Sequence, residues 1–118
     1  MEENVRKIIK TVYQRFNERD IDGALALLRP DVEWDNGMEG GRLVGTNAVR
    51  DYWTRQWRMV APQVLPKSIS GEHGKYSVEV HQIVRSLAGD MISESSVIHV
   101  FTVEGGKIAS MEIAKAKD

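Results

Sequence analysis

The sequence predicts an α+β fold in which helices from the first half pack on one face of a curved, mainly antiparallel sheet. Residues 2–17 carry apolar side chains at helical spacing, whereas residues 75–115 alternate apolar and polar side chains at strand spacing. Gly105 and Gly106 interrupt the second region and suit a two-residue hairpin turn, whose central positions need positive φ. With 118 residues, the chain is expected to form one domain with its own core.

Three helices are expected in the first half. The first spans about residues 2–17. Asp20 can cap a second, shorter helix, and Pro30 is expected to end it. Thr46 or Asn47 begins the third helix. One side of that helix carries Val49, Tyr52, Trp53, Gln56, Trp57 and Val60.

The strands are expected mostly in the second half. A short strand over residues 32–35 comes first and leads into a glycine-rich loop that ends at Gly45. The later strands are predicted over residues 65–70, 75–87, 91–104 and 107–115. Helices first and antiparallel strands last are typical of an α+β fold.

The composition argues against several classes of function. The absence of cysteine excludes disulfides and thiolate chemistry, and a net charge of −1 gives no electrostatic reason to bind nucleic acid or an anionic membrane. No apolar run approaches the roughly 20 residues of a membrane span. The three histidines lack metal-binding spacing, and no motif implies a cofactor, so neither is expected. We expect a cytoplasmic protein.

The predicted hairpin around Gly105 and Gly106 brings a histidine to the centre of the functional argument. A two-residue turn sets Glu104 opposite Lys107, and counting onward sets His99 opposite Glu112. An imidazole beside a carboxylate is a proton-transfer pair if it is buried in a pocket, and an ordinary surface pair if it faces water.

The residues leave open which face of the sheet holds His99. A three-residue turn near Gly89 would set Glu79 opposite His99, whereas a two-residue turn would set His81 opposite Ile98. By hydrophobicity alone, the opposite face would be the core side. That face is expected to carry Val78, Val80, Val84, Ile98, Val100, Met111 and Ile113.

Local motifs carry a family resemblance over nearly the whole chain. They are FNERDIDG at residues 16–23, DVEW at 31–34, LVGTNAV at 43–49, VIHVF at 97–101 and GKI at 106–108. With the order of elements, they make the chain similar to the NTF2-like superfamily, and within it to the SnoaL-like and ketosteroid-isomerase-like proteins.

The resemblance implies that helices and sheet form a cone around an apolar pocket, with a homodimer built on the outer sheet face. It implies an acid or histidine at His99, pointing into the cone. The usual catalytic aspartate falls on Asn36, one residue after Asp35, and the usual carbonyl-polarising tyrosine falls on Val12, one residue before Tyr13. Because one residue is about 100° around a helix and the opposite face of a strand, steroid isomerisation by the family mechanism is not expected.

Two kinds of function follow from these observations. One is an enzyme that binds a small apolar carbonyl compound and performs cofactor-free isomerisation, aldol-type cyclisation or hydration. In it, His99 would be the general acid or base, Glu112 its partner and Asp35 a second acid or base. The candidate substrate contacts are Tyr13, Asn36, Trp53, Trp57, His81 and Phe101.

The other is a non-catalytic ligand-binding or dimerisation module, in which the tryptophans and Tyr13 belong to the core and Asp35 and Asn36 only end a strand. A closed apolar cavity lined by His99, Tyr13 and Asp35 would favour the enzyme, and a collapsed interior would favour the module. In either case, a sheet with apolar residues on both faces predicts a two-fold homodimer through the outer face.

Overall fold

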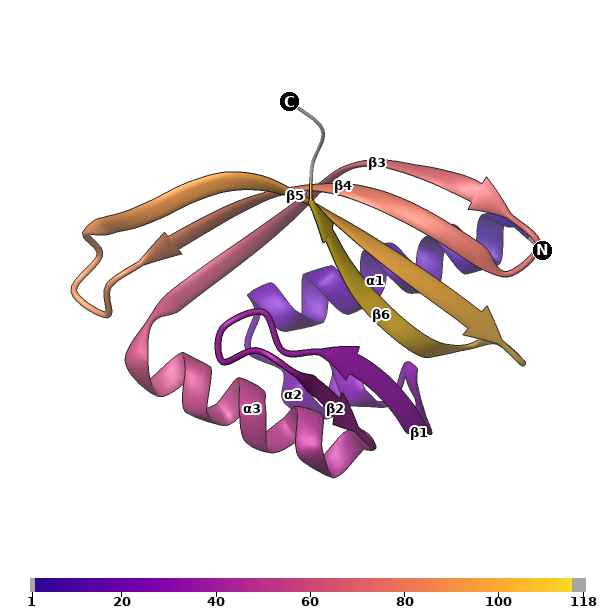
Figure 1. The fold of residues 1–118 in the computed structure, drawn as a ribbon, viewed down its shortest axis with the longest axis horizontal. Coiled ribbons are helices and arrows are strands. Elements are labelled where there is room, and N and C mark those ends of the chain that lie inside the picture. The colour runs from indigo at the N-terminus through magenta and orange to yellow at the C-terminus, as the bar shows by residue number, and fades with distance from the viewer. Residues whose placement is uncertain (1, 116–118) are drawn as a thin grey trace.

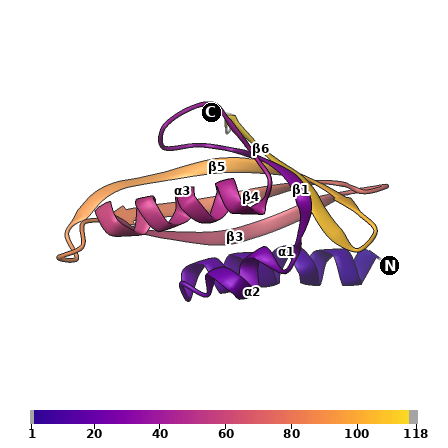
Figure 2. The same cartoon turned by 90° about the horizontal axis from the view of Figure 1, so that it is seen from below.

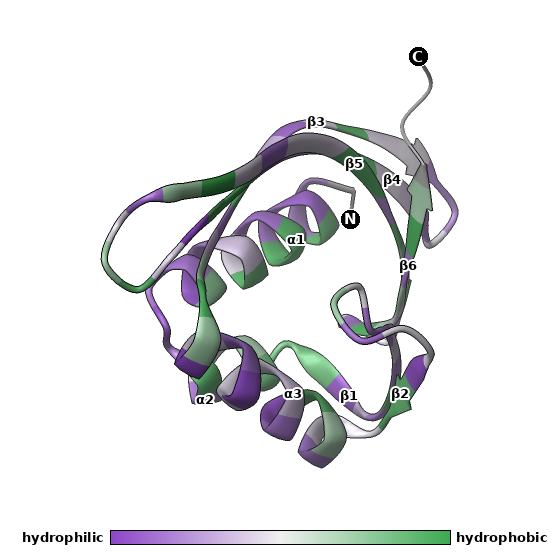
Figure 3. Ribbon diagram, turned by 60° about the vertical axis from the view of Figure 1, so that its left-hand side comes forward, coloured by the Kyte–Doolittle hydropathy of each residue, from purple (hydrophilic) through white to green (hydrophobic). Residues whose placement is uncertain are grey.

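The computed structural model describes residues 2–115, which form one curved sheet with three helices on its concave side (Figures 1 and 3). The elements in order are α1 (Glu2–Asn17), α2 (Ile21–Leu25), β1 (Leu28–Asp35), β2 (Arg42–Val44), α3 (Thr46–Met59), β3 (Ala61–Glu72), β4 (Lys75–Arg85), β5 (Met91–Glu104) and β6 (Lys107–Lys115). The predicted α+β class is therefore confirmed. The third helix follows two strands, so the helices do not all precede the sheet.

The sheet is mixed and not wholly antiparallel. Its strand order is β2-β1-β6-β5-β4-β3, and β1 lies parallel to β6 while the other neighbours are antiparallel. The connection between β4 and β5 projects beyond α3 at one end of the molecule (Figures 1 and 2). None of the described helices has the length and apolar character to cross a membrane.

The first strand begins earlier than predicted. Pro30 does not end a helix but lies within β1, where the pairing with β6 is irregular between Leu28 and Glu33. Proline has no N–H to donate to the ladder, so it is tolerated where the pairing is irregular and no donor is needed. The glycine-rich segment also contains a short strand, β2, which the sequence did not predict, and β3 is longer than the predicted residues 65–70.

The core lies between α1, α3 and the concave face of the sheet. The apolar stripe of α1 is buried as predicted, with Ile9 fully enclosed and Phe16 in edge contact with Trp53. Phe101 on β5 is among the largest fully buried side chains. Burial of a side chain of this size stabilises the fold by about 1.5–3 kcal/mol.

The register between β5 and β6 is shifted by a bulge. Glu104 pairs with Lys107 as predicted, but Ala109 is left unpaired between the next two pairs. An extra residue on one strand moves every later pair along by one position. His99 therefore lies opposite Ile113, and the predicted pairing with Glu112 is wrong.

A second irregularity changes the register between β4 and β5. Arg85 pairs with Met91, the next pair is Val84 with Ser93, and Ile92 is left over. His99 consequently lies opposite Val78, so neither of the two predicted registers is correct. Residues directly opposite each other point to the same face of a sheet. His99 thus shares the concave face with apolar side chains that the sequence assigned to the other face.

Candidate active site

A mostly apolar cavity of about 430 Å³ lies between the helices and the concave face of the sheet. Its volume is within the range of small-molecule sites, roughly 300–1,000 Å³. The predicted site residues that line it are Tyr13, Asp35, Trp53, His99 and Phe101. The interior is therefore not collapsed, and the three residues whose presence would favour an enzyme, His99, Tyr13 and Asp35, all line the cavity.

His99 and Tyr13 form a hydrogen-bonded pair in the cavity wall. The hydroxyl oxygen of Tyr13 lies 2.7 Å from Nδ1 of His99, and the two rings stack with centroids 5.9 Å apart. Both residues are buried, with 4% of the surface of Tyr13 and 8% of the surface of His99 exposed. A helix of the first half and a strand of the second half thus place two proton-carrying groups in direct contact.

Burial shifts the ionisation of both partners in opposite directions. Desolvation lowers the pKa of His99 to about 4, so the imidazole is neutral at pH 7. Desolvation also raises the pKa of Tyr13 well above its usual range, so the phenol keeps its proton. The pair is therefore a neutral hydrogen-bonded unit across the physiological pH range.

Asp35, at the end of β1, is among the residues that line the cavity, and both of its carboxylate oxygens are engaged. Oδ1 accepts a hydrogen bond from Nη1 of Arg42 at 2.7 Å, and Oδ2 accepts one from the backbone N–H of Ile113 at 2.8 Å. These contacts tie β1 to β2 and to β6. Asp35 is the only charged side chain among the described residues that line the cavity.

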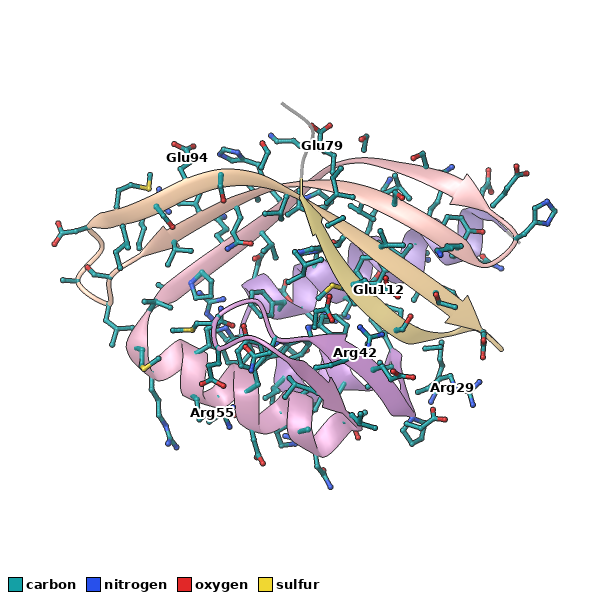
Figure 4. All side chains as sticks on the ribbon, in the orientation of Figure 1. Arg29, Arg42, Arg55, Glu79, Glu94 and Glu112 are labelled. Atoms are coloured by element: carbon teal, nitrogen blue, oxygen red, sulfur yellow. The ribbon has the colours of Figure 1, made fainter. Side chains whose placement is uncertain are left out.

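Glu112 does not belong to this site. It lies opposite Val100, its side chain is 56% exposed, and its Oε1 is 4.0 Å from Nη2 of Arg42. Figure 4 shows Glu112 beside Arg42. Glu112 is outside the site because the bulge at Ala109 shifts the register of β6 and places the Glu112 side chain on the face of the sheet opposite to that of His99.

His81 also lies outside the cavity. It is on the outer face of the sheet, where its Nε2 is 2.6 Å from Oε2 of Glu94. The side chains of Glu79 and Glu94 point away from the helices in Figure 4. His81 and Glu112 thus cannot join His99 in a metal site, and the described residues hold no cluster of three or more potential metal ligands.

Asn36 and Trp57 likewise serve the structure around the cavity. The side-chain oxygen of Asn36 accepts hydrogen bonds from the N–H groups of Met38 and Glu39, at 3.2 and 2.7 Å, and so holds the turn after β1. Trp57 stacks behind Trp53 and does not line the cavity. Neither residue is among those that line the cavity, and their contact with a ligand stays a prediction.

The sequence reasoning missed several side chains of the cavity wall. Gln82 was not singled out, although it breaks a run of valines at inward positions of β4, and Gln56 was noted only as part of a helix face. Tyr52 accepts a hydrogen bond from the N–H of Met38 at 3.2 Å and so ties the loop after β1 to α3. For Gln82, the signal available in the sequence was a single polar residue among the apolar residues that alternate along β4.

The sequence matches the SnoaL-like domain family over residues 9–111. Among solved structures, TerC co-crystallised with polyporic acid is 26% identical, with a TM-score of 0.83 over 96% of this chain and 91% of that one. A comparison with curated proteins gave no match.

Two structures from Mycobacterium tuberculosis share the fold at lower identity. A protein in complex with estradiol-17β-hemisuccinate is 16% identical, with a TM-score of 0.82 over 96% of this chain and 94% of that one. An LEH-like epoxide hydrolase is 17% identical, with a TM-score of 0.81 over 94% and 81%. At these identities, the likeness concerns the fold alone.

Proposed function

The chain belongs to the SnoaL-like family of the NTF2-like superfamily, and we propose that it binds a small apolar carbonyl compound and catalyses cofactor-free proton transfer on it. The open, mostly apolar cavity supports ligand binding. TerC, a relative of the same fold, is co-crystallised with polyporic acid, which supports the same expectation.

The hydrogen bond between Tyr13 and His99 is the observation that carries the proposal. We assign the Tyr13 hydroxyl as the donor to Nδ1 of His99, because this hydroxyl has no other acceptor among the described residues; in this tautomer the ring proton resides on Nε2. Nε2 has no hydrogen bond to a described residue, and the ring lines the cavity. His99 therefore offers a neutral N–H donor to a ligand carbonyl. In a dry site, such a donor stabilises the negative charge that develops on an enolate oxygen.

Asp35 is the proposed base. Its carboxylate would remove a proton from the carbon next to the carbonyl group while His99 holds the oxygen. Each carboxylate oxygen has a second lone pair beyond the one engaged by Arg42 or by Ile113. Return of the proton from Asp35 to another carbon completes an isomerisation. In an aldol-type cyclisation, the enolate instead attacks a second carbonyl group, and the alkoxide that forms takes the proton back from Asp35.

Binding without catalysis is the alternative, and one observation favours it. Both oxygens of Asp35 already accept a hydrogen bond, from Arg42 and from the N–H of Ile113, so the carboxylate has a structural task in holding β1 to β2 and β6. A ligand-binding module needs the cavity and the donor at His99 but no base.

Exchange of carbon-bound hydrogen separates the two functions. The protein is incubated with 2-tetralone in D₂O, and loss of the α-proton signals is followed by NMR. We expect exchange faster than in buffer, and a decrease of about 100-fold or more in Asp35→Asn and His99→Phe. His81→Gln, on the outer face, is the control that retains the rate. Binding of 2-tetralone without accelerated exchange would favour the binding module.

We also propose a homodimer through the outer face of the sheet. Ile83, Ile98 and Val100 point to that face and remain partly exposed there. Because the helices cover only the concave side, a second copy of the chain is the partner that would bury this strip.

A further inference from the structure

Two glutamines interrupt the apolar wall of the cavity. Gln82 lies on β4 between Val80 and Val84, at an inward position, and Gln56 reaches the cavity from α3. Both residues are half-buried, and neither amide makes a hydrogen bond to another described residue or is sealed from solvent. Each is therefore a polar group that faces the cavity and has no task in holding the fold.

The amide of Gln82 is far from the proposed reacting centre. Val78 lies opposite His99, and Gln82 is four residues further along β4. At about 3.3 Å per residue, this separation is about 13 Å along the strand. The cavity thus presents a donor at one end, on His99, and an amide at the other.

The charges around the cavity disfavour an anionic ligand. Asp35 is the only charged side chain among the described lining residues, and the cation nearest to it, Arg42, is already bound to it. His99 is neutral. A ligand carboxylate would therefore lose its hydration without gaining a cation, which is strongly unfavourable.

We infer that Gln56 and Gln82 determine specificity, and select elongated neutral carbonyl compounds with a hydroxyl or second carbonyl group about 7–13 Å from the reacting carbonyl. This range is the separation of about 13 Å along β4, less up to about 3 Å for the hydrogen bond at each end of the ligand. This inference rests on the proposed function for the position of the reacting carbonyl. The physical reason is hydration. A ligand without the distal polar group displaces water from the amides and leaves them unpaired, whereas a ligand with that group replaces the water.

Three compounds with one skeleton test the inference. Flavone, 4′-hydroxyflavone and flavone-4′-carboxylate share a carbonyl group and differ only at the distal end. Isothermal titration calorimetry with the wild-type chain should show 4′-hydroxyflavone binding about 10-fold more tightly than flavone, and the carboxylate binding at least 10-fold more weakly than flavone.

Gln82→Met and Gln56→Met remove the amides and keep the length of the side chains. In at least one of these variants, the advantage of 4′-hydroxyflavone over flavone should fall to less than about 3-fold, with flavone itself binding as well as before or better. Gln63→Met is the matched control. Gln63 lies between Pro62 and Val64, which both line the cavity, so its side chain is on the other face of β3 and the advantage should persist.

Equal affinity of the wild-type chain for flavone and 4′-hydroxyflavone would overturn the inference. An advantage that persists in both methionine variants would overturn it too, and so would failure of all three compounds to bind. 2-Tetralone has no distal polar group, so its exchange tests the proposed function without the contact to the glutamines that the inference concerns. The proposed function can therefore fail while the preference for 4′-hydroxyflavone holds, and the reverse is equally distinguishable.

Discussion

Protonation of His99 should destabilise the folded chain in mild acid. The perturbation is a decrease in pH from 7 to 4, compared between the wild type and His99→Gln. Glutamine does not titrate, and its side-chain oxygen can still accept the Tyr13 hydroxyl. Burial lowers the pKa of His99 from 6.5 to about 4, so between these values the unfolded chain binds a proton that the folded chain does not. Stability is thus lost as the pH falls through this window.

The size of the effect follows from the shift. A difference of one pKa unit corresponds to 1.36 kcal/mol, so a shift from 6.5 to about 4 gives a loss of about 3 kcal/mol that is complete near pH 4. The carboxylates also titrate in this range. Their contribution is common to the wild type and His99→Gln, and it cancels in the difference between the two.

Urea denaturation at pH 7, 6, 5 and 4, followed by tryptophan fluorescence, measures this difference. His73→Asn is a suitable control because His73 is exposed, and its positive φ of 54° is one that asparagine tolerates. The control should lose stability with acid as the wild type does, and His99→Gln should lose about 3 kcal/mol less. Equal losses in the wild type and His99→Gln would refute the conclusion that His99 is buried and neutral.

Three further predictions concern the same structure. Tyr13→Phe removes the donor to Nδ1 of His99 and should reduce the free energy of unfolding by about 1–3 kcal/mol at pH 7; a loss below about 0.5 kcal/mol in urea denaturation would contradict the hydrogen bond. Trp53→Ala should lower the free energy of unfolding by about 3–5 kcal/mol because Trp53 is buried, whereas Arg55→Ala, on the exposed side of α3, should lower it by less than about 1 kcal/mol. Similar denaturation midpoints for the two variants would show that the buried face of α3 is wrongly assigned. Sedimentation at micromolar concentration should show a dimer for the wild type and a monomer for Ile98→Lys, and a monomeric wild type would contradict the proposed interface.

The elements were predictable where local signals are strong. The helix over residues 2–17 and the strands over residues 91–104 and 107–115 have the predicted bounds, since the helix keeps its apolar spacing throughout and Gly105 and Gly106 mark the turn between the strands. Residues 28–31 were not recognised as strand. A proline there suggested the end of a helix, and only pairing with β6, some 80 residues away in sequence, makes the segment a strand.

The register was not predictable, and the site depended on it. The bulges at Ala109 and Ile92 involve residues with no special backbone requirement, so nothing in the sequence distinguishes them from ordinary strand positions. Each bulge moved later pairs by one position, which exchanges the two faces of a strand relative to its neighbour. His99 lines the cavity, but its hydrogen-bond partner is Tyr13 and not Glu112.

The family resemblance also placed Tyr13 and Asp35 one position from the family pattern, and this offset argued against steroid isomerisation by the family mechanism. In the structure, Tyr13 and Asp35 both line the cavity, whereas Asn36 is engaged in the turn after β1. The offset therefore does not remove these groups from the site. What remains against Asp35 as the base is that both of its carboxylate oxygens already accept a hydrogen bond, one from the guanidinium of Arg42 and one from the N–H of Ile113. The rate of 2-tetralone exchange in Asp35→Asn decides between the two roles. A large decrease would mean that Asp35 acts as the base despite these contacts, and an unchanged rate would mean that it only holds the wall of the cavity in place.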